Sequence, residues 1–207
     1  RDLALLGRAF VRDYPETSAY NNTKEFTVGT ITQPKRNLLL WRDGSVDGIK
    51  TGHTAAAGYC LMSSAQRGDQ RLIAVVLGGA SEKQRADDSL ALLNWGFRFF
   101  ETHRLYEPGK VVAEHKVWKG AADTVQLGVA QPMLVSLPRG RYNDLKPTID
   151  VPKTLTAPFT AGQQVGTLKV TLDGKVVAQA PLVAIAAVEE AGFFKRMWHS
   201  FLMWWES

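Results

Sequence analysis

The first half of the chain mixes helical and strand-like hydrophobic patterns. Near the N-terminus, Leu3, Leu6 and Phe10 recur at the spacing of one helical face. Two apolar runs, at 59–65 and 71–77, are joined by a short polar connection, which predicts an antiparallel hairpin. This half of the chain is therefore predicted to be α plus β.

A long helix is predicted to follow the hairpin. Ser81 and Gln84 have the spacing of a capping box, in which side chains bind main-chain N–H groups at the start of a helix. Beyond them, apolar residues recur at helical spacing at Leu90, Leu93, Phe97 and Phe100.

From about residue 106 to residue 188 the helical periodicity disappears. Short strand-like runs are divided there by Gly, Pro and Asp, which predicts a small all-β sandwich or barrel with a boundary near residues 107–109. Asp173 and Gly174 separate two of the runs, and glycine readily adopts the positive φ that a type I′ hairpin turn requires. The predicted strands are 110–118, 133–137, 146–151, 165–172 and 175–188.

The last segment, residues 189–207, is dense in aromatic side chains. It predicts a helix with an apolar face opposite Lys195, Arg196, His199 and Ser200. Such a helix is too short and too charged to span a bilayer, which takes about 20 apolar residues, but it suits the plane of the membrane interface. Packing on the β domain or on a partner subunit is the alternative. The predicted anchor residues are Phe193, Phe194, Met197, Trp198, Phe201, Leu202, Trp204 and Trp205.

Composition narrows the function only slightly. The net charge of +5 suits several anionic partners, and nucleic acid is not predicted because no zinc, helix-turn-helix or RNA-binding signature is present. The single cysteine, Cys60, excludes an intramolecular disulfide. No histidine has the spacing of a metal ligand. The sequence therefore predicts no metal and no cofactor.

The strongest candidate for chemistry is Lys50-Thr51-Gly52. An extended stretch precedes this triplet and small residues follow it, a context typical of the third motif of serine enzymes that act on penicillin. Lys50 would place positive charge beside a serine nucleophile, and the Thr51 hydroxyl would hold a substrate carboxylate. Gly52 leaves room for a substrate main chain along the strand, and the N–H of His53 would be one donor to an oxyanion.

The likeness extends well beyond one motif. Residues 33–37, 46–54, 75–79, 95–102 and 138–141, together with the β domain and the aromatic tail, resemble the low-molecular-mass penicillin-binding proteins. More narrowly, they resemble the Gram-negative D-alanyl-D-alanine carboxypeptidases.

The resemblance implies a fold of the α+β class. Residues 1–105 would be the C-terminal part of a penicillin-binding catalytic domain, of the serine β-lactamase and transpeptidase-like type. Residues 106–188 would form the small all-β sandwich domain, and residues 189–207 an amphipathic membrane-anchor helix.

The resemblance also implies a function. The enzyme would remove the terminal D-Ala from peptidoglycan stem pentapeptides through an acyl-enzyme, and β-lactam antibiotics would inhibit it. It would lie in the periplasm, attached peripherally to the lipid surface of the inner membrane by the C-terminal helix. Lys50 and His53 would act in catalysis, and Thr51, Gly52 and His53 would bind substrate. Arg98 matches an arginine that the family places near the substrate carboxylate, with a structural ion pair as its alternative.

One departure from the family pattern limits what this chain would do. It contains no Ser-x-x-Lys and no Ser-x-Asn sequence. The resemblance places both motifs upstream of Arg1, and the start of the chain, without initiator methionine or signal peptide, indicates a fragment or a processed product. The chain alone is therefore predicted to be inactive. A separate N-terminal chain carrying the serine would complete the site.

Two other functions remain open. The chain could be a non-catalytic, membrane-tethered β module for partner docking, with the Lys-Thr-Gly strand as a relic, and the missing motifs favour this. A β-lactamase would share the triplet but would not explain the β domain and the aromatic tail.

Overall fold

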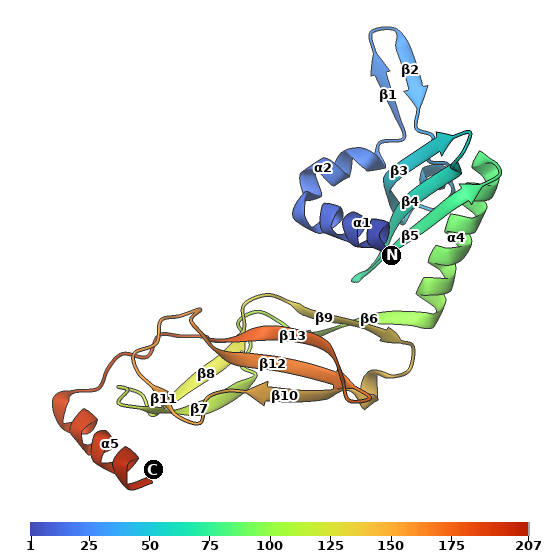
Figure 1. The fold of residues 1–207 in the computed structure, drawn as a ribbon. Helices are drawn as coiled ribbons and strands as arrows, with labels where there is room; N and C mark the ends of the chain where they lie inside the picture. The colour runs from blue at the N-terminus through green and yellow to red at the C-terminus, as the bar shows by residue number, and fades with distance from the viewer. Residues whose placement is uncertain (207) are drawn as a thin grey trace. The chain divides into compact units, whose positions relative to one another are not determined.

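The computed structural model describes residues 1–206, which form two compact units (Figure 1). The first unit is Arg1–Glu101, and the second begins at Thr102. The first is α+β, and the second is an all-β unit that ends in a helix, in agreement with the predicted fold class.

The first unit is built on a three-stranded antiparallel sheet in the order β3-β4-β5. β4 and β5 form the predicted hairpin, with Gln66 opposite Arg71 and a turn at Gly68, where φ is 59°. β3 pairs with the other side of β4 and is an edge strand of this sheet. The bounds are β3 (Val46–Thr54), β4 (Gly58–Arg67) and β5 (Gln70–Gly79).

Helix α4 (Glu82–Phe99) covers one face of this sheet (Figure 1). Its side chains Leu93 and Phe97 share a buried cluster with Leu61 of β4. Gly96 permits the close approach, because a Cβ atom at this position would lie 2.6 Å from the side chain of Leu72.

The predicted capping residue starts α4. The Oγ of Ser81 accepts a hydrogen bond from the N–H of Gln84 at 3.1 Å. The Gln84 side chain returns the interaction to Ala80 rather than to Ser81, accepting the Ala80 N–H at 3.2 Å. The helix start is therefore confirmed, with the reciprocal bond one residue further upstream.

Helix α1 (Asp2–Asp13) approaches the opposite face of the sheet through Gly7. A Cβ atom on Gly7 would lie 2.7 Å from the sulfur of Met62, so the helix main chain sits close to the strands. Leu3 and Leu6 are 43% and 59% exposed. The predicted helix is therefore confirmed, but its close contact with the sheet is made by the smallest residue and not by these two leucines.

A hairpin and a short helix connect α1 to the sheet. Asn37 is buried, its Oδ1 accepts the N–H of Leu39 at 3.2 Å, and its Nδ2 donates to the carbonyl of Gly48 at 3.3 Å. Asn37 therefore joins the short helix α3 to strand β3. The bounds in this region are α2 (Pro15–Ala19), the 3-10 helix η1 (Tyr20–Asn22), β1 (Glu25–Val28), β2 (Ile31–Pro34) and α3 (Leu39–Arg42).

The second unit contains a six-stranded sheet in the order β10-β12-β13-β8-β7-β11 and a smaller pair, β6-β9. Met133 of β9 joins the buried core of the large sheet, together with Leu127, Leu168 and Leu182. The two sheets therefore enclose this main cluster, and a smaller separate cluster holds Val135, Leu137 and Leu172. The bounds are β6 (Phe100–Tyr106), β7 (Ala113–Trp118), β8 (Thr124–Val129), β9 (Met133–Pro138), η2 (Tyr142–Asp144), β10 (Lys146–Asp150), β11 (Leu155–Thr156), β12 (Gln164–Leu172) and β13 (Lys175–Ala184).

The sequence located most of these strands but not all of them. The turn at Asp173-Gly174 is confirmed, because both residues have positive φ, 51° and 75°. Strands β6, β8 and β11 were missed, and Phe100, expected in the long helix, begins β6. In β8, Val125, Leu127 and Val129 alternate along the strand and are buried. That alternation was the available signal.

Helix α5 (Phe193–Glu206) packs on the second unit through a polar side. The Nδ1 of His199 accepts the N–H of Lys119 at 2.8 Å. Lys195 donates to the carbonyl of Ala121 at 3.1 Å and pairs with Asp123 at 2.8 Å, which lowers the pKa of the Asp123 carboxyl.

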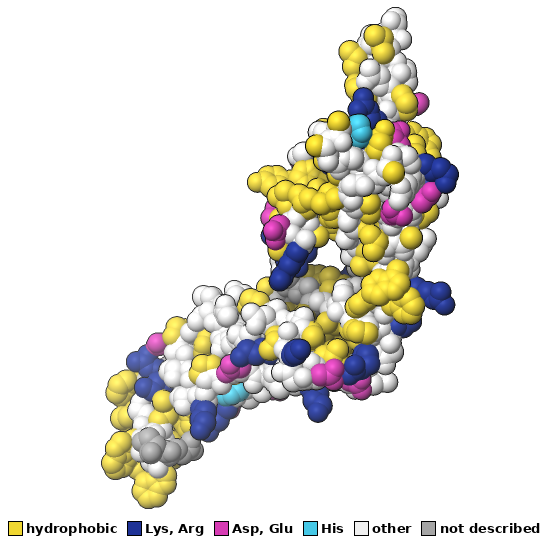
Figure 2. Space-filling view, turned by 45° about the vertical axis from the view of Figure 1, so that its right-hand side comes forward, with side chains coloured by type: hydrophobic (Ala, Val, Ile, Leu, Met, Phe, Trp, Pro, Cys, Tyr) yellow, Lys and Arg dark blue, Asp and Glu magenta, His cyan; other side chains and the backbone are white. Residues whose placement is uncertain are grey.

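The aromatic side of α5 faces solvent. Hydrophobic side chains gather over this helix in Figure 2, with Lys and Arg beside them. Leu202 is an exception to the prediction: it is half-buried, three residues from His199 on the packed side. Within residues 1–206, no helix is long and apolar enough to cross a membrane. The exposed large side chains are Phe193, Phe194, Met197, Trp198, Phe201, Trp204 and Trp205.

Candidate functional site

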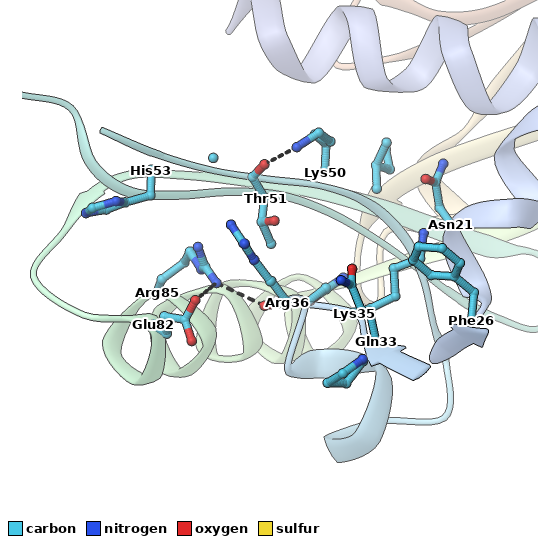
Figure 3. A pocket seen from close by; sticks show the side chains of 14 residues that line it. Asn21, Phe26, Gln33, Lys35, Arg36, Lys50, Thr51, His53, Glu82 and Arg85 are labelled. Carbon is cyan, nitrogen blue, oxygen red and sulfur yellow. Dashed lines mark hydrogen bonds and ion pairs between the residues drawn. The ribbon is translucent and has the colours of Figure 1, made fainter. Parts of the chain in front are cut away.

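The Lys-Thr-Gly triplet lies on edge strand β3, beside a cavity of about 640 Å³ (Figure 3). Strand β3 forms one wall, the start of α4 a second, and the segment around β2 a third. Four of the five predicted site residues line this cavity. They are Lys50, Thr51, Gly52 and His53.

Lys50 and Thr51 project to opposite sides of β3, as neighbouring strand residues do (Figure 3). The Lys50 ammonium is exposed and donates to the main-chain carbonyl of Thr51. The Thr51 side chain points toward Arg36 and Arg85 (Figure 3). The strand therefore presents a cation on one side and a hydroxyl with two guanidinium groups on the other.

Arg85 is the residue that the sequence did not single out. It is 2% exposed, and it lies in the first turn of α4, a short distance after the Ser81 cap. Its guanidinium donates to the carbonyl of Arg36 at 3.0 Å and lies 3.5 Å from Glu82. It also lies 5.6 Å from the ring centre of Tyr59, a cation–π distance. A buried guanidinium held on several sides is a rigid donor for a carboxylate.

The structure does not bring Arg98 to this cavity. Arg98 is exposed near the C-terminal end of α4, above the ring of Phe99 at 5.5 Å. It follows Arg85 by 13 residues, and that separation is about 20 Å along a helix axis. The assignment of Arg98 to the substrate carboxylate is therefore not supported. Arg85, on the same helix, occupies the position beside the triplet.

His53 lies at the open end of the strand. Its ring packs on Tyr59, the residue opposite it on β4, with ring centres 4.0 Å apart. This contact holds the side chain against the sheet.

The start of β3 is fixed by a polar network around Asp43. Burial alone would raise the pKa of Asp43, but hydrogen bonds from Ser45 and Arg67 outweigh that effect and lower the pKa. The Asp43 carboxylate accepts the Ser45 hydroxyl at 2.6 Å and the Arg67 guanidinium at 2.7 Å. Arg67 also lies 4.2 Å from the ring centre of Phe97. The network joins the strand that carries the triplet to helix α4.

Several other residues line the cavity without having been predicted, among them Asn21 and Phe26. Asn21 comes from η1, and Phe26 comes from the exposed strand β1. Their distance from the triplet along the sequence does not predict this position, because the hairpin and the short helix between them and β3 bring them to the cavity. Among residues 1–206, no group of three or more His, Cys, Asp or Glu side chains is arranged to hold a metal ion.

Comparisons with known proteins show the family of the chain. Residues 1–81 match the D-alanyl-D-alanine carboxypeptidase family. Residues 100–190 match the family described as penicillin-binding protein 5, C-terminal domain. The chain belongs to the D-alanyl-D-alanine carboxypeptidase family.

Two relatives and one solved structure illustrate the match. The chain is 47% identical over 206 residues to D-alanyl-D-alanine carboxypeptidase DacC of Escherichia coli (strain K12), covering 98% of this chain and 51% of the relative. It is 45% identical over 199 residues to DacA of the same strain, covering 95% and 49%. Penicillin binding protein 5 from Haemophilus influenzae gives a TM-score of 0.77 at 40% identity, covering 91% of this chain and 56% of that one.

The chain spans about half the length of the relatives that it matches. It corresponds to the C-terminal part of these penicillin-binding proteins, since one matched family is a C-terminal domain. The family membership and the fold class predicted from the sequence are thus confirmed.

Proposed function

We propose that this chain supplies the Lys-Thr-Gly side of the substrate site of a serine-type D-alanyl-D-alanine carboxypeptidase. The observation that carries the proposal is the joint placement of Lys50, Thr51 and Arg85 at one cavity on an edge strand. The relatives DacC and DacA are named for this activity, and each is about twice as long as this chain.

The edge strand explains how a peptide would bind. A stem peptide ending in D-Ala-D-Ala would lie along β3 as an added strand, and Gly52 would leave space for its main chain. Its terminal carboxylate would accept the Thr51 hydroxyl and the guanidinium groups of Arg85 and Arg36. Charge-assisted hydrogen bonds of this kind are the strong ones, particularly from a buried arginine.

The chemistry would need a serine from elsewhere in the parent protein. That serine would attack the penultimate D-Ala carbonyl and expel the terminal D-Ala, and water would then hydrolyse the acyl-enzyme. Lys50 would stabilise the negative charge that develops beside the nucleophile. The His53 N–H would donate to the oxyanion, a contact that is typically worth about 3 kcal/mol in the transition state. β-Lactams would occupy the same cavity and trap the serine.

The C-terminal helix would hold the protein on a membrane surface. Seven large apolar side chains of α5 are 50% or more exposed. Burial of such side chains in the interfacial region of a bilayer is favourable, and it does not require the helix to span the membrane. We place this surface on the outer face of the inner membrane, in the periplasm.

A labelled penicillin tests the catalytic proposal directly. The chain alone should take up no label, whereas a protein that joins it to the upstream half of a family member should gain the mass of one β-lactam. In that longer protein, Lys50→Ala should slow acylation by at least about 100-fold, in the range for a lost electrostatic contact to the transition state. Lys83→Ala is the matched control, because Lys83 is an exposed lysine of α4 outside the cavity.

Two results would contradict the proposal. One is labelling of the chain alone, and the other is acylation of the Lys50→Ala protein at the normal rate. The second result would mean that the Lys-Thr-Gly strand does not contribute to acylation, and this chain would then be a module that only docks or anchors, a role that the buried core of the second unit and the exposed aromatic side of α5 also suit.

A further inference from the structure

A second cavity, of about 530 Å³, lies between α5 and the loops of the second unit. Its polar lining consists of Lys119, Thr156, Glu190, Arg196 and Ser200. Phe193 lines it as well, so the first turn of α5, with the positive end of the helix dipole, lies beside it. The proposed carboxypeptidase reaction does not use this cavity.

Lys119 has a main-chain conformation that favours glycine. Its φ is 59°, and it is one of two described residues other than glycine with a positive φ. Helix α5 and the residues just before it hold Lys119 there: its N–H donates to His199 of α5 at 2.8 Å, and its carbonyl accepts the N–H of Ala191 at 2.8 Å. A positive φ is strained for lysine and unstrained for glycine. Strained main-chain positions occur most often at functional sites, so we infer a function for the Lys119 side chain.

The charges around this cavity do not cancel. Arg196 forms an ion pair with Glu190, and Lys195, on the same helix, is paired with Asp123. No described residue pairs with the ammonium of Lys119. One positive charge is therefore left over, together with the hydroxyls of Thr156 and Ser200.

We propose that this cavity binds the phosphate of an anionic phospholipid headgroup. This inference rests on the proposed membrane anchor, because the cavity opens beside the exposed apolar side chains Phe193 and Met197 of α5. A bilayer that buries those side chains brings its headgroups to the level of Lys119. The aromatic side chains then supply general affinity for bilayers, and the cavity supplies a preference for negative charge.

Vesicle binding separates the two contributions. The full chain is tested by co-sedimentation with vesicles of phosphatidylcholine alone and of phosphatidylcholine mixed with phosphatidylglycerol. Lys119→Gly keeps the positive φ without strain, so its thermal unfolding midpoint should not fall. It should bind the mixed vesicles about fivefold more weakly than the original chain, as expected for one basic residue at an anionic surface. Its binding to neutral vesicles should not change.

Two further variants make the test specific. Lys175→Ala removes the same charge at the β12–β13 turn, at the opposite end of the sheet from Lys119, and should change binding by less than about twofold, because charges beyond a Debye length are screened. Glu190→Gln removes the negative charge from the cavity lining and should strengthen binding to the mixed vesicles.

The outcomes distinguish the cavity from the anchor. Equal binding of Lys119→Gly and the original chain to mixed vesicles would overturn the headgroup site alone, as would an equal loss in Lys175→Ala. Binding to neither kind of vesicle would overturn both the site and the anchor. Inorganic phosphate at constant ionic strength should reduce only the part of the affinity that depends on Lys119. If phosphate protects the chain thermally through Lys119 while lipid charge has no effect, the ligand is a soluble phosphate, and the lipid assignment is wrong.

Discussion

The two units differ in how completely they bury their own apolar residues. The second unit encloses a cluster of thirteen buried residues between its sheets, and Leu127, Leu168 and Leu182 in it have no exposed surface. The first unit buries a cluster of nine between one sheet face and α4. Outside that cluster it exposes apolar side chains on both helices, at Leu3, Leu5, Leu6, Leu92, Trp95 and Phe99.

The sheet edges differ in the same way. β5 (Gln70–Gly79) is a ten-residue edge strand of the first unit with a largely apolar sequence. Long apolar edges invite pairing with another strand. In the second unit one edge is the two-residue strand β11, which is too short to pair with a strand of another molecule. The comparison teaches that the second unit can form its core from its own residues, whereas we expect the first to be stabilised by additional chain of the kind its longer relatives have.

The largest predicted effect compares one leucine from each core. Leu168→Ala should lower the free energy of unfolding of the second unit by about 3 kcal/mol, and Leu93→Ala that of the first by about 2 kcal/mol, because a smaller and more open core relaxes around the cavity. Hydrogen exchange measured by mass spectrometry would assign each loss to its unit. Loss of protection in both units from either change would show that they unfold as one body, and the comparison would fail.

Arginine substitutions on α4 should have the next largest effect. Arg85→Ala should destabilise the first unit by about 2 kcal/mol, because the Arg36 carbonyl and Glu82 lose a buried partner. Arg98→Ala, on the same helix but exposed, should change stability by less than about 0.5 kcal/mol. Urea unfolding of both variants checks this. Equal effects would mean that the burial of Arg85 does not contribute to the stability of this unit.

Acid should weaken the first unit through Asp43. The pKa of Asp43 is lowered in the folded state, so its contribution is present above its unfolded pKa and is lost as pH falls through the folded pKa. Asp43→Asn should therefore cost about 1 kcal/mol at neutral pH, and the difference from the original chain should disappear in acid. Asp123 also has a lowered pKa, but its side chain is 81% exposed and its ion pair is screened. Unfolding curves measured from neutral pH to pH about 3 check this. The prediction is wrong if Asp123→Asn lowers the unfolding free energy more than Asp43→Asn does.

The smallest effect on stability should come from the exposed apolar residues. Trp95→Lys should change the unfolding free energy by less than about 0.5 kcal/mol, because the ring is 55% exposed. It should nevertheless reduce self-association of the chain, measured by sedimentation velocity. Val176→Lys, at a residue of the second unit that is 54% exposed, is the control and should leave association unchanged. A large loss of stability in Trp95→Lys would mean that this surface is already packed.

Local chemistry made much of the fold predictable. The β4–β5 hairpin, the Ser81 cap and the Asp173-Gly174 turn each depend on a few neighbouring residues, and each was located correctly. Strand β11 could not be predicted in this way. It has two residues and exists because Leu155 and Thr156 pair in parallel with the end of β7.

The site shows the same division. Lys50, Thr51, Gly52 and His53 are contiguous, so one strand necessarily carries them together. The arginine beside them could not be chosen from the sequence, because Arg85 and Arg98 lie on one helix and only the packing of α4 against the sheet decides which of them reaches β3.

Residue order alone therefore established which groups are present and which of them lie adjacent along a strand or a turn, because those relations follow from main-chain geometry. Packing decided the rest. It selected Gly7 instead of the leucines as the contact of α1, turned the polar side of α5 inward through His199, and placed a buried guanidinium beside the triplet. Each of these outcomes depends on how closely two elements approach, and that distance is set by side chains far apart in the chain.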